Sequence, residues 1–115
     1  MRKISIILVS LLFLFAQCEQ PQCTGFRTLA QQPGTAIIDV RTTSEFAAGH
    51  IPQSINIPLH VLLDSVEKLE GFENIILVCR SGNRSGQAKV LLQERGFENV
   101  FNGGSWQAFQ RRYLN

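Results

Sequence analysis

Short apolar runs alternate along this chain with segments in which apolar residues recur at helical spacing. The two clearest runs, 35–40 and 74–78, are rich in β-branched residues and bounded by turn-forming residues, so they predict buried strands. Two briefer strands are predicted at 54–58 and 98–101. Helices are predicted in the remaining segments, at 43–48, 59–69, 85–95 and 105–113, with a helical turn at 26–32. Strands that alternate with helices pair in parallel and bury both faces of their sheet, so the pattern predicts an α/β fold.

Polar residues at the predicted helix starts are suited to capping. Thr42 or Thr43 opens the helix at 43–48, Ser85 opens the helix at 85–95, and Ser105 opens the last helix. A hydroxyl at such a position accepts a hydrogen bond from a free N–H of the first turn. We therefore expect these side chains to act as N-caps.

The first eighteen residues have the pattern of an export signal. Arg2 and Lys3 precede an apolar run at 4–16, which is shorter than the roughly 20 residues that span a bilayer. The alternatives are an N-terminal membrane anchor and a buried helix. Cleavage before a lipidated Cys18 and ordinary cleavage between Ala16 and Glu19 both fit. We expect a protein that is exported to the periplasm or lipid-anchored to a bacterial envelope. The predicted organisation is a signal peptide at 1–18, a linker with a short N-terminal element at 19–33, and one domain at 34–115.

Charge and cysteine content narrow the functional classes. The net charge of +2 comes from Arg2 and Lys3 in the signal, and the rest of the chain carries nine basic and nine acidic residues. It has no basic footprint for nucleic acid. Cys18 and Cys23 form a disulfide, or Cys18 is lipidated and Cys23 is free; the spacing fits both. They make a poor metal site, and we expect neither a metal nor another cofactor.

The segment 79–86, Cys-Arg-Ser-Gly-Asn-Arg-Ser-Gly, carries the candidate chemistry. Cys79 ends a predicted strand, and the loop after it leads into a helix whose N-terminus attracts anions. Arginines and a helix N-terminus lower a cysteine pKa, so Cys79 is the candidate nucleophile. The alternative is an unreactive cysteine that only packs in the core, and such a cysteine would not need a glycine-rich loop after it. The residues expected to bind an anionic substrate are Arg80, Ser81, Gly82, Asn83, Arg84 and Ser85. The alternatives are that Arg80 is a solvated surface charge and that Arg84 points away and pairs with an acid near the rim.

Several motifs, in this order, resemble those of rhodanese domains. They are Ile38-Asp39-Val40-Arg41, Glu45-Phe46, Gly49-His50-Ile51-Pro52, Ile55-Asn56-Ile57-Pro58, Cys79-x4-Arg84-Ser85, and Asn102-Gly103-Gly104 followed by Trp106. The resemblance covers roughly residues 34–113. It implies an open parallel sheet of four to five strands with helices on both faces. Members of the family usually have an extra strand and helix before the Ile38-Asp39-Val40-Arg41 strand, and residues 22–33 leave little room for them, so the first strand of that sheet is expected to be tiny or absent.

The resemblance also implies an activity. Cys79 would take the sulfane sulfur of an anionic donor such as thiosulfate, become a persulfide, and pass the sulfur to cyanide, sulfite or a thiol. A non-catalytic persulfide carrier or sulfide-binding module that serves a partner protein is the alternative. A cysteine phosphatase is disfavoured, because that class uses Cys-x5-Arg to surround a phosphate. We expect a monomer whose partners are the donor and the thiophilic acceptor.

Three positions near these motifs are expected to be structural. Asp39 and Arg41 end a strand and are placed to flank the site, but we expect a structural role, in which a buried Asp39 caps backbone amides or pairs with an arginine. His50 should orient the turn before Pro52, and acting as a general base is its alternative role. Trp106 and Phe109 recur at helical spacing and should belong to the core.

Overall fold

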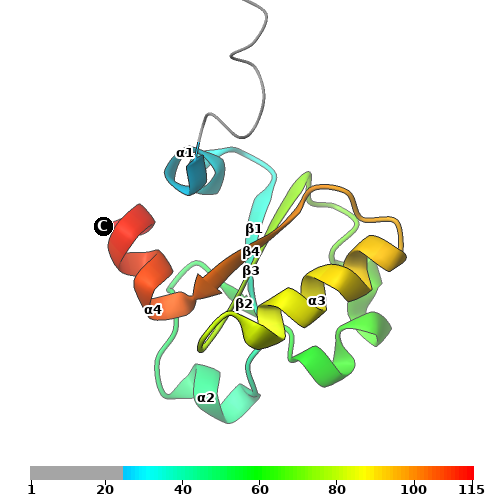
Figure 1. The fold of residues 1–115 in the computed structure, drawn as a ribbon, viewed down its shortest axis with the longest axis horizontal. Coiled ribbons are helices and arrows are strands. Elements are labelled where there is room, and N and C mark those ends of the chain that lie inside the picture. Colours follow the sequence, from blue (N-terminus) through cyan, green and yellow to red (C-terminus); the bar gives the residue numbers. More distant parts are fainter. Residues whose placement is uncertain (1–24) are drawn as a thin grey trace, which may run out of the picture.

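The computed structural model of the chain describes residues 25–115 (Figure 1). Elements of the first half are α1 (Gly25–Gln31), β1 (Thr35–Asp39), α2 (Thr43–Ala47), β2 (Ile55–Asn56) and the 3-10 helices η2 (Leu59–Val61) and η3 (Leu63–Lys68). Elements of the second half are β3 (Asn74–Cys79), α3 (Asn83–Glu94), β4 (Val100–Ser105), α4 (Trp106–Phe109) and the π-helix η4 (Gln110–Leu114). The proposed signal peptide and the cysteines Cys18 and Cys23 lie outside the described residues. Within 25–115, no helix is both long and apolar enough to cross a membrane.

The four strands form one parallel sheet in the order β2-β1-β3-β4. The predicted α/β fold with an open parallel sheet is thus confirmed, with four strands in the described part of the chain. Within residues 25–115 no strand precedes β1. Parallel pairing brings the carboxyl ends of β1 and β3 to one edge, where Asp39 pairs with Val78, directly before Cys79.

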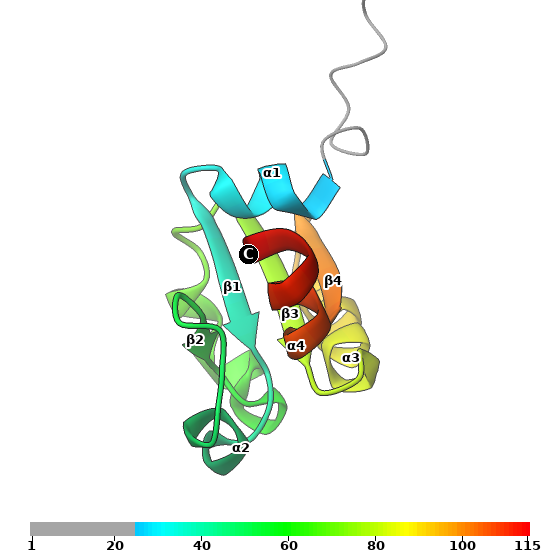
Figure 2. The same ribbon diagram turned by 90° about the vertical axis from the view of Figure 1, so that its left-hand side faces the viewer.

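Side chains alternate along β1 and β3 and feed two separate cores. Ile38, Leu77 and Cys79 face a core that α3 completes through Ala88 and Leu92. On the other face, Ile37, Ile76 and Val78 pack with Leu29 of α1 and Phe109 of α4. Figures 1 and 2 show this division, with α3 on one side of the sheet and α1 beside the C-terminal helix on the other. Cys79 therefore points to the same face as α3.

Two predicted helices take a different form. The segment 59–69 forms the 3-10 helices η2 and η3 instead of the predicted α-helix. Apolar residues three apart share a face in a 3-10 helix as well as in an α-helix. The pattern therefore does not distinguish the two. The helix at 105–113 begins at its N-cap Ser105, whose Oγ accepts from Ala108 N–H at 3.3 Å, but it widens into η4 after Phe109. The wider turn lets both Phe109 and Leu114 pack on the α1 side of the sheet.

The last strand is longer than predicted, because Asn102-Gly103-Gly104 forms part of β4 rather than a turn. Its register against β3 shifts between Leu77, opposite Asn102, and Val78, opposite Gly104, which leaves Gly103 as the extra residue of a bulge. A Cβ on Gly103 would lie 2.9 Å from Ile76 Cγ2 and 3.1 Å from the Leu77 carbonyl oxygen. Only glycine fits this position without movement of the sheet.

Replacing Gly103 with alanine tests whether the bulge depends on that close approach. We expect Gly103→Ala to lower the free energy of unfolding by about 1–3 kcal/mol, the usual cost of overpacking. Gly71→Ala is the matched control, because nothing lies within 4 Å of a Cβ at that exposed glycine. Urea unfolding of both variants measures the difference, and equal stabilities would show that the sheet absorbs the methyl group freely.

Candidate active site

The segment after β3 bends tightly around the Cys79 side chain. Cys79 is 1% exposed and ends the strand. The chain turns at Gly82, whose φ of 96° is a left-handed conformation that glycine adopts without strain, and α3 starts at the next residue. This geometry lets the Gly82 N–H donate to Cys79 Sγ at 3.0 Å. The loop is thus shaped around the sulfur atom.

Hydrogen bonds in the loop stabilise the thiolate form of Cys79. Burial by itself raises the pKa of the thiol, but hydrogen bonds from the Ser85 hydroxyl and from the backbone at Ser85, Ser81 and Gly82 outweigh it. The net effect lowers the pKa of Cys79 below its ordinary value. The prediction of a cysteine activated by its loop is consistent with this arrangement.

Ser85 does not cap α3, contrary to the sequence-based prediction. The N-cap is Gly82, because the tight turn brings the chain into helical geometry at Asn83, two residues before Ser85. Ser85 is consequently inside the first turn and fully buried, with its Oγ 3.3 Å from Cys79 Sγ. Its hydroxyl contacts the sulfur instead of the free N–H groups of the helix.

Arg84 is held in place by a carboxylate from another element. Its Nη1 and Nη2 donate to Glu45 Oε1 and Oε2 at 2.7 and 2.9 Å, a bidentate pair between α3 and α2. The Arg84 hydrogen bonds lower the pKa of Glu45 to about 2. The same bonds raise the pKa of Arg84, and the charge on Cys79 adds to that effect. Arg84 thus supplies positive charge near the sulfur but is already partnered.

The other predicted binding residues surround the loop opening. Arg80, Ser81 and Asn83 are all exposed, and Arg80 forms no ion pair with any residue in 25–115. An unpaired arginine beside a buried thiolate can contact an incoming anion directly. Of the predicted loop residues, the structure brings Ser81, Gly82 and Ser85 into hydrogen-bond contact with Cys79 and places the charge of Arg84 near it, while the Arg80 and Asn83 side chains are exposed.

Asn102 contacts the loop and was not predicted as a site residue. Its Oδ1 accepts the Ser85 hydroxyl at 2.7 Å, and its Nδ2 donates to the Gly82 carbonyl oxygen at 3.1 Å. The sequence indicated a turn at 102–104, so nothing placed this side chain next to a loop twenty residues earlier. Pairing of β4 with β3 would have been the signal, since it sets Asn102 beside the strand that ends in Cys79.

Asp39, which was expected to cap backbone amides or to pair with an arginine, does both with Arg41. Arg41 Nη2 lies 2.7 Å from Asp39 Oδ2, and Asp39 Oδ1 also accepts from the Arg41 backbone N–H. The guanidinium further donates to the carbonyl oxygens of Glu45 and Gly49 and stacks 4.6 Å from the Trp106 ring centroid. This pair joins the end of β1 to α2 and to the C-terminal helix.

His50 and Trp106 have structural contacts. His50 Nδ1 lies 2.7 Å from the Phe46 carbonyl oxygen, and its ring stacks on the Phe46 ring with centroids 3.7 Å apart. Trp106 and Phe109 pack in the core on the α1 side of the sheet. These contacts agree with the predicted structural roles.

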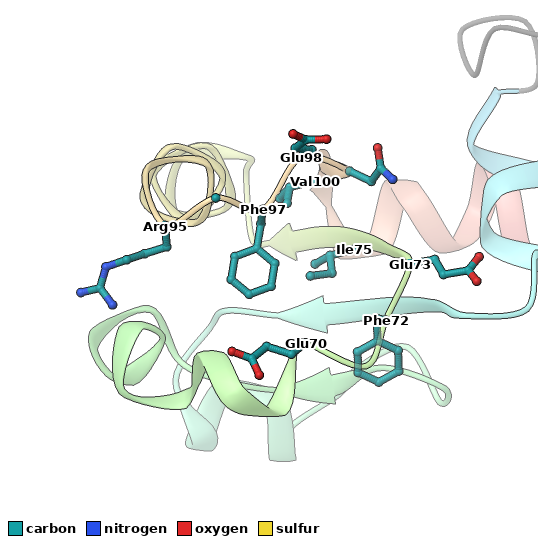
Figure 3. A pocket seen from close by; sticks show the side chains of 10 residues that line it. Glu70, Phe72, Glu73, Ile75, Arg95, Phe97, Glu98 and Val100 are labelled. Carbon is teal, nitrogen blue, oxygen red and sulfur yellow. The ribbon is translucent and has the colours of Figure 1, made fainter.

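Two hollows in the surface lie at different distances from the loop. A cleft of about 400 Å³ is lined by residues at the amino ends of β3 and β4, including Ile75 and Val100, and contains no residue of the Cys79 loop (Figure 3). A smaller recess of about 270 Å³ adjoins Arg84. Its lining residues are Val40, Thr42, Pro58, Leu59, His60 and Arg84.

Within residues 25–115, no three His, Cys, Asp or Glu side chains come together as metal ligands.

The fold is an open parallel α/β sheet, with a buried cysteine at a strand end and hydrogen-bond donors around its sulfur. The chain belongs to the rhodanese-like domain family, whose sequence model matches residues 24–112. The predicted family is thereby confirmed.

Individual relatives agree with this assignment. The chain is 32% identical over 74 residues to a sulfurtransferase of Allochromatium vinosum, covering 64% of this chain and 69% of the relative. It is 29% identical over 84 residues to the thiosulfate sulfurtransferase GlpE of Pseudomonas savastanoi, covering 72% and 79%. A solved rhodanese with anions from E. coli is 32% identical with a TM-score of 0.59, covering 64% of this chain and 88% of that one. Sulfur transfer is therefore the general activity that the chain's relatives support.

The Glu45–Arg84 pair makes a prediction about acid stability. Because the folded state holds the pKa of Glu45 at about 2, below its ordinary value of 4.5, the pair stabilises the fold above pH 4.5. That contribution should disappear as the pH falls from about 4.5 to about 2. We expect Glu45→Gln to lower the thermal midpoint at pH 7 and to match the wild type near pH 2.

The control for this experiment is Glu67→Gln, at an exposed carboxylate of η3 that forms no ion pair within 25–115. Its thermal midpoint should follow the wild-type curve at every pH. If the thermal midpoint of Glu45→Gln stays below that of the wild type by the same amount down to pH 2, the stabilising role of the Glu45–Arg84 pair is contradicted.

Proposed function

We propose that the protein is a thiosulfate sulfurtransferase that works through a Cys79 persulfide. The observation that carries the proposal is the buried Cys79 Sγ with the Gly82 N–H 3.0 Å away, in a loop that surrounds one atom. The Cys79 thiolate, which is the nucleophile and the group released in the second half-reaction, would carry its negative charge at the atom toward which the loop donors point. Donors placed before the charge forms stabilise it at no cost of reorganisation.

The proposed reaction has two half-reactions. The Cys79 thiolate attacks the outer sulfur of thiosulfate, the sulfur–sulfur bond of the donor breaks, and sulfite leaves with the bonding electron pair. Cys79 is now a persulfide. A thiophilic acceptor such as cyanide, sulfite or a thiol then attacks the terminal sulfur, and Cys79 departs as the thiolate. Electrons and charges balance without an added oxidant or a proton relay, which is consistent with the structural role of His50.

The two arginines of the loop have different roles in the proposed reaction. Arg80 is exposed and unpaired within 25–115, so it is the residue suited to attract a dianion and to hold its sulfonate end. Arg84 is committed to Glu45, and its charge supports the thiolate from the α3 side. A persulfide carrier that serves another protein would also need Cys79, and turnover distinguishes the two functions.

Replacing the nucleophile tests the proposal. We expect Cys79→Ser to abolish formation of thiocyanate from thiosulfate and cyanide, because a serine hydroxyl is not ionised in this loop. The fold should survive, since oxygen and sulfur differ little in size here. Wild-type protein that gives persulfide but no thiocyanate would identify a carrier, and full activity in Cys79→Ser would refute the mechanism.

The size of the loop makes a further prediction. Inserting one glycine between Gly82 and Asn83 moves the Gly82 N–H away from the sulfur and separates it from the start of α3. Thiosulfate turnover should fall by about 10²-fold or more, the scale for loss of one well-placed donor to a developing charge.

The matched control is a glycine inserted after Gly71, in an exposed turn with nothing within 4 Å of a Cβ. Both proteins should give similar circular dichroism spectra. Equal turnover of the two insertion variants would mean that the placement of the loop donors does not matter.

A further inference from the structure

Asn102 connects β4 to the cysteine loop through its side-chain amide. Besides the Ser85 and Gly82 contacts, its Oδ1 accepts the Gly104 N–H at 3.0 Å. Three hydrogen bonds thus hold a side chain that lies at the surface.

The two backbone partners determine which way the amide faces. The Gly104 N–H needs an acceptor, and the Gly82 carbonyl oxygen needs a donor. A flipped amide would face each of these groups with the wrong atom, so Oδ1 must be the atom that faces Ser85. Because Oδ1 has no hydrogen, Ser85 is the donor in their 2.7 Å contact.

This bond limits what Ser85 can offer to Cys79. A serine hydroxyl has one hydrogen, and here it is directed to Asn102. Towards Cys79 Sγ, at 3.3 Å, Ser85 then presents a lone pair. A lone pair accepts the S–H of the thiol, whereas a thiolate needs the hydroxyl hydrogen. The two forms of Cys79 therefore require two orientations of the Ser85 hydroxyl.

The charged groups around Cys79 do not remove this competition. Arg84 on α3 faces the sulfur but is paired with Glu45 of α2. Asp39, at the end of β1, is likewise paired with Arg41. On β4 the residues opposite the end of β3, Gly104 and Ser105, carry no charge, and Arg80 of the loop is exposed.

We propose that Asn102 is a positioning residue that holds the Ser85 hydroxyl while Cys79 is a thiol and releases it to the sulfur when Cys79 becomes a thiolate. The thiol proton leaves to solvent, the hydroxyl turns from Oδ1 to Sγ, and the reverse turn follows reprotonation. Asn102 thereby competes with the thiolate for one hydrogen and moderates its formation. The inference rests on the proposed role of Cys79 as a thiolate nucleophile.

Titration of Cys79 without any sulfur donor tests this competition. The rate of alkylation by iodoacetamide between pH 5 and pH 10 reports the thiolate fraction. The proteins are wild type, Asn102→Ala, Ser85→Ala and the double variant, each with Cys18 and Cys23 replaced by serine. Asn102→Ala should lower the pKa of Cys79 by about 0.5 to 1 unit, the worth of one neutral hydrogen bond. In the Ser85→Ala background the same change should have no effect.

A merely structural role for Asn102 gives different results. Loss of its bonds to Gly82 and Gly104 would loosen the loop donors and raise the pKa of Cys79, with or without Ser85. A rise, or an equal shift in both backgrounds, therefore overturns the proposal. Asn74→Ala is the matched control, because Asn74 bonds Thr35 Oγ1 at the opposite end of the sheet and should leave the titration unchanged.

A second variant keeps the test decisive if Asn102→Ala does not fold. Asn102→Asp retains acceptors for Ser85 and for the Gly104 N–H, so the pKa of Cys79 should rise more with Ser85 present than in the Ser85→Ala background, and a fall or an equal rise in both backgrounds contradicts the proposal. Because the titration uses no sulfur donor such as thiosulfate, the pKa that it measures is independent of sulfur transfer. A protein that titrates as expected but gives no persulfide would refute the proposed function and leave the role of Asn102 intact.

Discussion

The account of this protein depends on how a negative charge is stabilised on a buried sulfur. Burial opposes ionisation of Cys79, and hydrogen bonds from Ser85 and from the turn at Gly82 offset that cost. Such donors can converge only where a strand ends and the chain reverses sharply into a helix. The parallel sheet supplies this position, because it places the ends of β1 and β3 at one edge with cores on both sides.

The loop is held from two directions, and each support reaches across the sheet. From the β1 side, the buried Asp39–Arg41 pair fixes α2, and Glu45 on α2 binds Arg84. From the β4 side, Asn102 binds Gly82 and Ser85 next to the bulge at Gly103. A loop fixed at both ends keeps its donors in place while the charge on the sulfur changes. These contacts explain why a carboxylate stands at Glu45 and a residue without a side chain at Gly103.

Local sequence pattern was sufficient to predict the strands and the loop that build the site. The β-branched runs predicted β1 and β3, the glycine-rich segment predicted the loop, and Thr42, one of the two residues expected to cap α2, does so. Contacts between distant segments were harder to foresee, since the partner depends on which elements become neighbours. Asn102 and the register shift in β4 belong to this class. The 3-10 geometry at 59–69 was missed for another reason, because a spacing of three residues suits both kinds of helix.

The central claim is that Cys79 accepts a sulfur atom within this loop, and intact-mass spectrometry tests it most directly. Protein with Cys18 and Cys23 replaced by serine is treated with thiosulfate, freed of excess reagent and weighed before and after addition of cyanide. The account predicts a gain of one sulfur atom that maps to the peptide containing Cys79 and disappears with cyanide. A mass that thiosulfate leaves unchanged, under conditions in which iodoacetamide alkylates Cys79, would contradict it.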